Sequence, residues 1–267
     1  MRTYLLFILA LFYLDSSAQC FTSNRAFGNG EEISFTVSYN WGPVWVDAGL
    51  VTFSAVSEMY KGKPAWHLKS TGKTFKSYDI LFKVRDYYDS WVDPGTFKTH
   101  EFRRYIYEGG YTLLNTMTYD PIRELVYSNT KTNSNPVRMD TLKLTPCLFD
   151  MVAAVYYVRT LDLADMKPEV RIPVNVMIDD SVYQIQIRTV GREIVEHPDG
   201  KRYRCIRFAA MMVKGTIFKG EEDVNVWVTD DPNKIPVYVE AKILIGTIKA
   251  YLKSYKGLLH PMTSLIK

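Results

Sequence analysis

Apolar and polar residues alternate with a period of two through most of the chain, and this feature most limits how the chain can fold. The alternation is clear in segments 33–39, 170–178 and 183–188. Successive side chains of a β-strand point to opposite faces, so the pattern indicates strands with one buried face. The 19 tyrosines and 13 phenylalanines are also typical of strands. The sequence therefore predicts a mainly β protein.

Short turn sequences separate the strand-like segments. They occur at 61–64 (Lys-Gly-Lys-Pro), 93–95 (Asp-Pro-Gly), 179–180 (Asp-Asp) and 197–200 (His-Pro-Asp-Gly). Such turns join antiparallel neighbours. The absence of a fixed-period repeat disfavours solenoids and propellers. We expect a curved antiparallel sheet or a partly closed barrel.

One segment has helical spacing instead. Apolar residues recur every three to four positions over 149–157, after Thr145-Pro146 and before Arg159. This predicts one central helix over about residues 147–160, with an exposed loop at 130–140 before it. A lone helix must bury its apolar stripe against a sheet. We therefore expect residues 19–267 to form a single β-rich domain.

The first 18 residues have the pattern of a signal peptide. Arg2 precedes an uninterrupted apolar run over 4–14, and Ser16 and Ala18 are small residues at the positions that a signal peptidase accepts. We expect cleavage after Ala18 and export to the periplasm or cell envelope.

Two membrane-anchored alternatives compete with simple export. Cys20 follows the apolar run, but Gln19 stands where lipoprotein processing requires a small residue, so lipid anchoring at Cys20 is disfavoured. A span of about 20 apolar residues is also needed for an uncleaved membrane helix, and Asp15 ends the run too early. No integral membrane span is therefore expected after signal removal.

The net charge bears on the expected partners, and the cysteine content bears on possible disulfides. The net charge is +4 without a block of like charges, so nucleic acid is not an expected partner. Export would permit a disulfide among Cys20, Cys147 and Cys205. Cys147 and Cys205 have apolar neighbours, so small buried packing residues are the favoured interpretation and a bridge between them the alternative.

An outer-membrane barrel shares the alternation and is the main alternative fold. Such barrels present a continuous apolar band to lipid and have no central globular helix. Several lysines interrupt the strand-like segments and would spoil the band: Lys69, Lys83, Lys214, Lys219, Lys242 and Lys249. A water-soluble sheet is favoured.

A set of motifs spread over the chain resembles a known family. The motifs are Gly30-Glu31-Glu32-Ile33 through Tyr39, Asp47-Ala48-Gly49-Leu50, Phe149-Asp150-Met151 leading to Tyr157-Val158-Arg159, Val226 through Val237 with Asp230-Asp231-Pro232-Asn233, and Ile245-Gly246-Thr247-Ile248. Together they are similar to domain-of-unknown-function family 3108, which consists of bacterial exported envelope proteins. Each motif also has a local structural explanation, such as a tight turn at 230–233.

The resemblance implies a periplasmic or envelope protein of Gram-negative bacteria. It also suggests a LolA-like or lipocalin-like barrel, with a curved sheet wrapped on helical material as in the lipoprotein carriers LolA and LolB. This second implication is a fold-level analogy. It transfers no site residue to this chain.

A search for catalytic and metal-binding motifs finds none. His67, His100, His197 and His260 are isolated from one another and from the cysteines, so no zinc pattern exists, and no metal or other cofactor is expected. Nucleophile-elbow and phosphate-binding glycine motifs are also absent. Carboxylates cluster at Asp86, Asp89 and Asp93 and at Glu221, Glu222 and Asp223, which keeps acid–base hydrolysis open as an alternative.

Some segments are apolar on both faces, which indicates that both faces are covered. Trp227 lies opposite Val226 and Val228, and Trp91, with Tyr87 on its own face, is a second large aromatic residue opposite an apolar row. The second face could pack against the helix or form an apolar groove. Trp91, Trp227, Leu244 and Ile248 are the residues expected to line such a groove.

These observations leave three hypotheses for function. The first is a noncatalytic envelope protein that binds an apolar or lipid-like ligand on a concave sheet face. The second is a structural or assembly module that binds other envelope proteins. The third is an unrecognised hydrolase that uses Asp86, Asp89 or Glu222.

Overall fold

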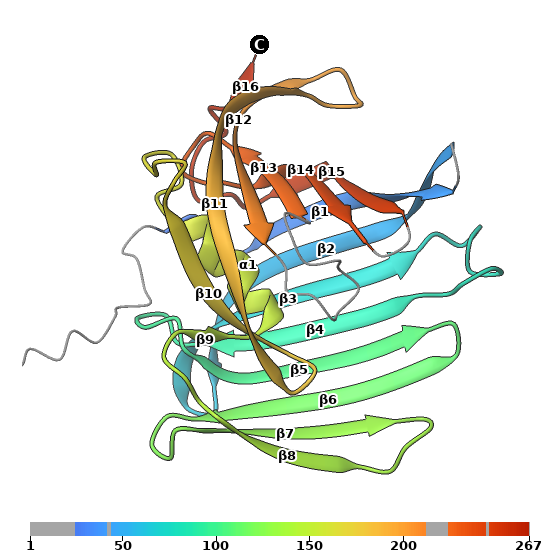
Figure 1. Ribbon diagram of the computed structural model, residues 1–267, viewed down its shortest axis with the longest axis vertical. Helices are drawn as coiled ribbons and strands as arrows, with labels where there is room; N and C mark the ends of the chain where they lie inside the picture. Colours follow the sequence, from blue (N-terminus) through green and yellow to red (C-terminus); the bar gives the residue numbers. More distant parts are fainter. Residues whose placement is uncertain (1–24, 42–43, 212–223, 244–245, 267) are drawn as a thin grey trace, which may run out of the picture.

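The computed structural model of the protein describes residues 25–41, 44–211, 224–243 and 246–266. The expected signal peptide, its cleavage site after Ala18 and Cys20 lie outside the described residues. In the part that is described, sixteen strands form one sheet and one α-helix lies against it (Figure 1).

The strands follow the chain in short hairpins. The first half contains β1 (Glu31–Trp41), β2 (Val44–Tyr60), β3 (Lys63–Thr74), β4 (Arg85–Val92), β5 (Thr99–Glu108), β6 (Tyr111–Asp120), β7 (Leu125–Thr132) and β8 (Arg138–Lys143). The second half contains β9 (Leu148–Phe149), the helix α1 (Met151–Thr160), β10 (Arg171–Ile178), β11 (Ser181–Glu196), β12 (Arg202–Met211), β13 (Val224–Thr229), β14 (Pro236–Lys242), β15 (Thr247–Lys256) and β16 (Leu265–Ile266).

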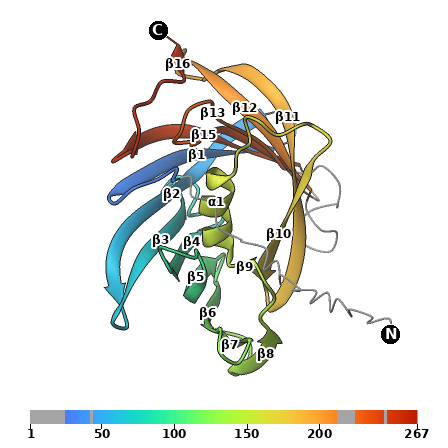
Figure 2. The same ribbon diagram turned by 90° about the vertical axis from the view of Figure 1, so that its left-hand side faces the viewer.

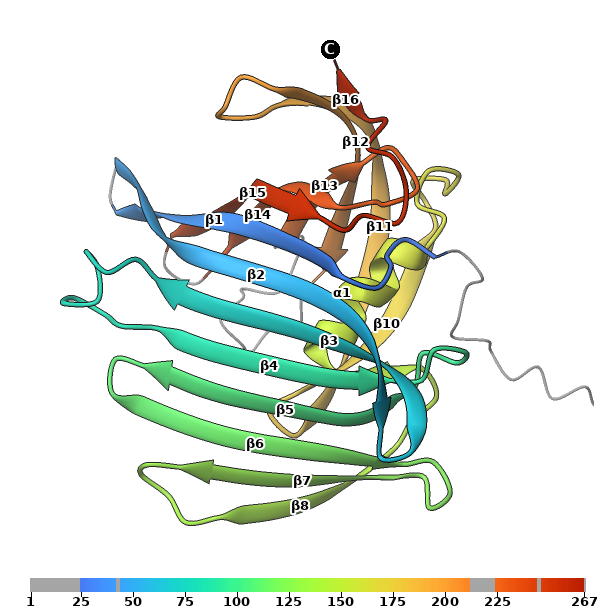
Figure 3. The ribbon, with the colours of Figure 1, turned by 180° about the vertical axis from the view of Figure 1, so that it is seen from behind.

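The sheet order joins the two halves of the chain through their first and last long strands. The order is β8-β7-β6-β5-β4-β3-β2-β1-β15-β14-β13-β12-β11-β10-β9, and β16 pairs with β12. The pairing is antiparallel except between β9 and β10, which are parallel. Figure 3 shows β1 to β8 side by side in chain order. The expectation of a curved antiparallel sheet is confirmed, and the sheet is not closed into a barrel.

The sheet curves around α1, which lies on its concave side (Figure 2). The helix covers residues 151–160 and so begins a few residues later than the expected 147–160, because residues 148–149 form β9. The expected loop at 130–140 is shorter than predicted. β7 continues to Thr132 and β8 begins at Arg138, so only residues 133–137 connect them.

Strand register separates the concave face from the convex face. Ala55, Leu68, Ser90 and Phe102 are direct cross-strand neighbours on β2 to β5, and Leu68 and Phe102 belong to the same buried core as the helix. Side chains in register with them therefore lie on the concave face. Their immediate chain neighbours lie on the convex face.

The first turn of α1 is fixed to the sheet by Asp150. The Asp150 carboxylate accepts backbone hydrogen bonds from Val152 and Ala153 at 2.9 Å each, which is the usual capping of a helix N-terminus. It also accepts hydrogen bonds from the hydroxyls of Ser90 on β4, at 2.6 Å, and Thr99 on β5, at 2.9 Å. Burial raises the pKa of this carboxyl, and the four donors satisfy it inside the core.

The last turn of α1 is fixed by a buried ion pair. The Arg159 guanidinium binds Glu31 of β1 in a bidentate manner, with Nη1–Oε1 at 2.7 Å and Nη2–Oε2 at 2.8 Å. Arg159 also donates to the backbone carbonyls of Asn233 and Ala26. The side chains of Arg159 and Glu31 are 4% and 0% exposed. This pair joins the helix to β1 and to the turn between β13 and β14.

The turn between β13 and β14 also holds the C-terminal segment through hydrogen bonds. The Asn233 side chain donates to the backbone carbonyl of His260 and accepts from its N–H. Asp231 accepts from the Thr229 hydroxyl and from the Ser264 N–H. Glu31, Arg159 and Asn233, which belong to motifs distant in sequence, thus meet at one place in the structure.

The cysteines do not form the bridge that was considered between Cys147 and Cys205. Cys147 is disulfide-bonded, whereas Cys205 is a buried free thiol, so the two are not partners. Burial raises the pKa of the Cys205 thiol to about 12, which makes it an inert packing residue, as expected for that position. The interpretation of Cys147 as a packing residue alone is corrected.

Within the described ranges no helix has the length and apolar character needed to cross a bilayer.

Removing one partner of the buried ion pair should destabilise the protein strongly. Glu31→Gln leaves the Arg159 charge buried without its counter-ion, which costs about 3–5 kcal/mol of unfolding free energy. The matched control is Glu32→Gln, because the neighbouring Glu32 makes an exposed pair with Lys256, worth less than about 1 kcal/mol. Urea denaturation measures both, and equal losses would contradict the role of the pair.

Candidate functional site

An apolar surface covers the concave side of five adjacent strands. Cross-strand pairing places Val37, Ala250, Val239, Val226 and Phe208 in one row, and Tyr39, Ile248, Ala241, Val224 and Ala210 in the next. Phe208 and Ala210 belong to the main core, and Val224 and Val226 pack against it, so both rows face the concave side. We call the other eight residues of the two rows the apolar wall.

The apolar wall is only half-buried. All eight of its side chains keep part of their surface exposed. The helix packs mainly against β3, β4, β9 and β10, so it lies away from β13 to β15. Apolar side chains on a concave face that are not fully buried by the protein offer surface to a ligand.

A second, polar surface lies on the concave side of β4 to β7. Tyr88, Arg104, Asn115 and Thr130 are direct cross-strand neighbours, and Asp86 lies on the same face of β4 as Tyr88. We call these five residues the polar wall. The concave face is therefore amphipathic, with polar groups on one side and apolar groups on the other.

Asp86 is the carboxyl of the polar wall, and its pKa is raised by its surroundings. Burial, and next the negative charge of Glu108, raise the pKa of Asp86 to about 6. A hydrogen bond from the Tyr107 N–H, at 3.2 Å, acts in the opposite direction. The carboxyl is thus partly protonated near neutral pH.

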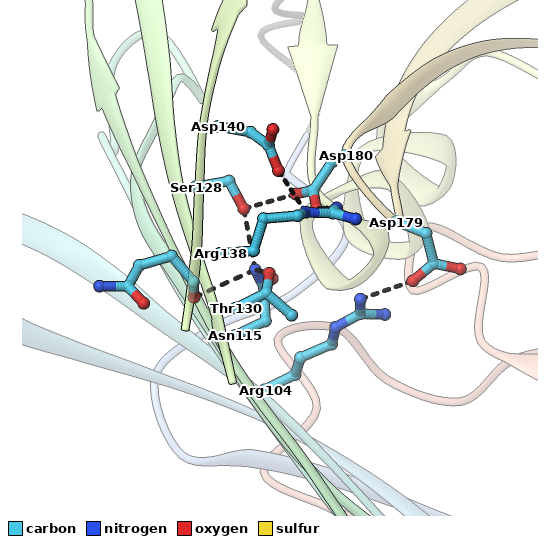
Figure 4. A network of polar contacts seen from close by, with 9 residues as sticks. Arg104, Asn115, Ser128, Thr130, Arg138, Asp140, Asp179 and Asp180 are labelled. Carbon is cyan, nitrogen blue, oxygen red and sulfur yellow. Dashed lines mark hydrogen bonds and ion pairs between the residues drawn. The ribbon is translucent and has the colours of Figure 1, made fainter. Parts of the chain in front are cut away.

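Side chains, not backbone pairing, connect the polar wall to the far end of the sheet. The turn between β10 and β11 consists of Asp179 and Asp180, which both have positive φ, at 47° and 59°. Arg104 donates from Nη2 to Asp179 Oδ1 at 2.5 Å. Asp180 accepts from Ser128 of β7 and pairs with Arg138 of β8 (Figure 4). These contacts bring β5, β7 and β8 to the β10–β11 hairpin across the opening of the sheet.

Two atoms of this network are buried without a hydrogen-bond partner. They are Arg104 Nε and Asn115 Oδ1. The Asn115 amide donates to the hydroxyls of Ser128, at 2.9 Å, and Thr130, at 2.7 Å, which fixes its orientation. Buried polar atoms in native proteins are nearly always paired, so unpaired ones point to an additional partner.

The structure separates the four residues expected to line a groove. Ile248 belongs to the apolar wall. Trp91 and Trp227 lie on the convex face, contrary to that expectation. Trp91 is in register with His67, next to the concave Leu68, and it stacks on His67 at 4.3 Å and on Tyr60 at 4.6 Å. Leu244 lies outside the described residues.

Trp227 is part of a convex aromatic stack. Its ring stacks on Tyr238 at 4.8 Å, Tyr238 stacks on Tyr251 at 4.8 Å, and the Arg207 guanidinium lies over Trp227 at 4.9 Å. Its indole N–H donates to Glu193. Trp227 therefore covers the outer face of β13, whereas Val226 faces inward.

Asp86 and Asp89, two of the carboxylates proposed for hydrolysis, do not form a pair. Asp86 and Asp89 are three residues apart on β4, which places them on opposite faces. Asp89 binds the His67 ring on the convex side at 2.7 Å. Glu222 lies outside the described residues. Among the residues that are described, no group of three His, Cys, Asp or Glu side chains could hold a metal ion.

Arg104 and Asn115 were not identified from the sequence. The signal for Arg104 was present, because Phe102 is apolar and residues two apart share a face, which places Arg104 inward and Arg103 outward. A polar residue at an inward position of an alternating strand is the informative exception.

An open sheet wrapped around one helix, with an amphipathic concave face, defines the class of barrel-like β proteins whose sheet is not closed. Within that class, the chain belongs to the family described as protein of unknown function (DUF3108), whose profile matches residues 34–253. The resemblance seen in the sequence is confirmed.

A solved structure supports the fold. It is the beta-barrel-like protein of domain of unknown function DUF1849 from Brucella abortus, which matches with a TM-score of 0.53 and 7% sequence identity, over 87% of this chain and 99% of that chain. No protein with a curated description matches this chain.

The raised pKa of Asp86 predicts a pH-dependent effect of Asp86→Asn. The folded pKa of about 6 lies above the ordinary 3.8, so the wild-type carboxyl costs nothing below about pH 4 and destabilises the fold as pH rises to 6 and beyond. Asparagine keeps the acceptor for Tyr107. Asp86→Asn should be more stable than wild type by about 1–2 kcal/mol at pH 7.5, a value discounted for solvent screening, and nearly equal at pH 4. Urea denaturation at both pH values checks this, and a pH-independent difference would contradict it.

Proposed function

We propose that this protein is a noncatalytic protein of the cell envelope that binds an apolar or lipid-like ligand on its concave face. The observation that carries the proposal is the half-buried apolar wall on β1 and β13 to β15. Ligand sites for such molecules are concave and mostly apolar, with few polar groups that fix orientation. The polar wall supplies those groups.

Covering the apolar wall with an apolar ligand would contribute favourably to binding. Each 100 Å² of apolar surface removed from water contributes about 2.5 kcal/mol. Tyr39 and Ile248 are direct neighbours, and so are Val37 and Ala250, so one extended apolar chain could contact several of the eight residues at once. A polar ligand would gain little from this surface.

An exposed apolar loop lies at the end of the sheet that the helix leaves uncovered. Ile80, Leu81 and Phe82, between β3 and β4, are 91%, 68% and 53% exposed. The exposed Lys76 and Lys83 flank them. Apolar side chains beside basic ones favour contact with the interface of an anionic bilayer. We infer that the protein meets a membrane surface through this loop, close to the apolar wall.

A polar substitution in the apolar wall should weaken ligand binding. Ile248→Gln places an amide on the concave face, and we expect it to weaken binding of a fluorescent acyl probe by about tenfold, since losing one apolar contact costs about 1–3 kcal/mol. Leu114→Gln is the matched control, because Leu114 is 51% exposed and is next to Leu113, which is in register with the concave Ile106. Fluorescence titration measures both, and an equal effect of the two changes would contradict the proposed site.

The exposed loop predicts binding to anionic vesicles. Wild-type protein should float with vesicles of phosphatidylglycerol and phosphatidylcholine, and Ile80→Ser combined with Leu81→Ser should reduce the bound fraction several-fold, since fewer apolar side chains enter the interface. Ile122→Ser serves as the control, because Ile122 is 93% exposed in a different turn. If wild-type protein stays with the vesicle-free fraction, the loop has no membrane role.

A further inference from the structure

Arg104 is a buried charged side chain to which the proposed function assigns no role. It is 6% exposed, lies on the polar wall, and has one donor without a partner. Building on the proposed function, we propose that Arg104 binds the anionic head group, a carboxylate or a phosphate, of an amphipathic ligand whose apolar part lies on the apolar wall. Asp179 occupies part of this anion site in the present structure.

Asp179 accepts a hydrogen bond from Nη2 of the Arg104 guanidinium but not from Nε. Nε and Nη2 lie on the same edge of an arginine side chain and together bind an oxyanion in a bidentate manner. Asp179 accepts from Nη2 at 2.5 Å, whereas Nε is buried and unpaired. An oxyanion placed squarely on this edge would satisfy both donors. It would also remove the unfavourable burial of an unpaired N–H group.

Asp179 is suited to exchange with such a ligand. Its side chain is 68% exposed, so it can return to water when it leaves Arg104. The hairpin does not depend on it, because the adjacent Asp180 keeps its contacts with Ser128 and Arg138 (Figure 4). Asp179 can therefore leave Arg104 without breaking the contacts of Asp180.

The two walls are spaced for a long amphiphile. Arg104 is on β5 and Val37 on β1, which is four strand spacings away along the sheet. At about 4.8 Å per spacing, this corresponds to roughly 19 Å across the strands, and the offset along the strands adds to it, because Arg104 is in register with Ile33 and not with Val37. A ligand that contacts both walls is thus an extended molecule with one charged end. A small anion alone would use Arg104 but not the apolar wall.

The test compares a charged probe with its uncharged analogue. Palmitic acid that carries a fluorophore on the acyl chain and the methyl ester of the same compound are titrated into the purified protein. Arg104→Gln should weaken binding of the acid by about tenfold or more, because a charge-assisted pair is lost, and leave binding of the ester unchanged. Asp179→Asn should tighten binding of the acid, since the competing charge is removed.

The matched control is Arg103→Gln. Arg103 is the preceding residue on β5, lies on the convex face beside Trp91 and pairs with Glu101. The Arg103→Gln variant should bind both probes as the wild-type protein does. Circular dichroism checks that each variant is folded. If Arg104→Gln does not fold, Asp179→Asn carries the test alone.

The outcomes separate this inference from the proposed function. If acid and ester bind equally and neither Arg104→Gln nor Asp179→Asn changes this, the head-group role is wrong while the apolar site stands. If neither probe binds, both proposals are overturned. If inorganic phosphate displaces the acid at equal concentration, Arg104 serves a free anion and the head-group role is also wrong.

Discussion

The buried pair of Arg159 and Glu31 is the interaction on which the arrangement of the molecule depends. The helix has only ten residues, so it fills only part of the concave side of this wide sheet and its position must be fixed by specific contacts. The ion pair at one end of the helix and the Asp150 cap at the other fix it to β1, β4 and β5. Because the helix is held at one end of the concave face, the other end is left to the apolar and polar walls.

Side-chain contacts also connect the two sides of the open sheet. β8 and β9 are the two edges of the main path, and closing a barrel would pair them through backbone hydrogen bonds. In the described part of the chain the two sides meet through Arg104, Ser128, Arg138 and the two aspartates of the β10–β11 turn instead. A junction made of side chains can rearrange when a ligand competes for one of them, whereas a backbone ladder cannot do so without breaking strands. Arg104 of the polar wall therefore belongs both to this junction and to the proposed recognition surface.

The sequence contains enough information for the strands, the turns and the helix, because these follow from local periodicity. It also contains the face on which each residue lies relative to its neighbours, which would have placed Arg104 with Phe102 and separated Asp86 from Asp89. Periodicity does not say which face is concave, because that depends on where the helix packs. This is why Trp91 and Trp227 were expected on the concave face and lie on the convex one. The pair of Glu31 and Arg159 joins residues 128 positions apart, which no local pattern reveals.

The central claim is that an acyl chain lies on the apolar wall. Nuclear Overhauser effects between a long-chain fatty acid and isotope-labelled methyl groups of the protein test it most directly. The account predicts contacts from the acyl chain to the methyl groups of Val226, Val239 and Ile248. Contacts confined to exposed convex methyl groups such as those of Leu114, or no contacts in the presence of excess fatty acid, would contradict it.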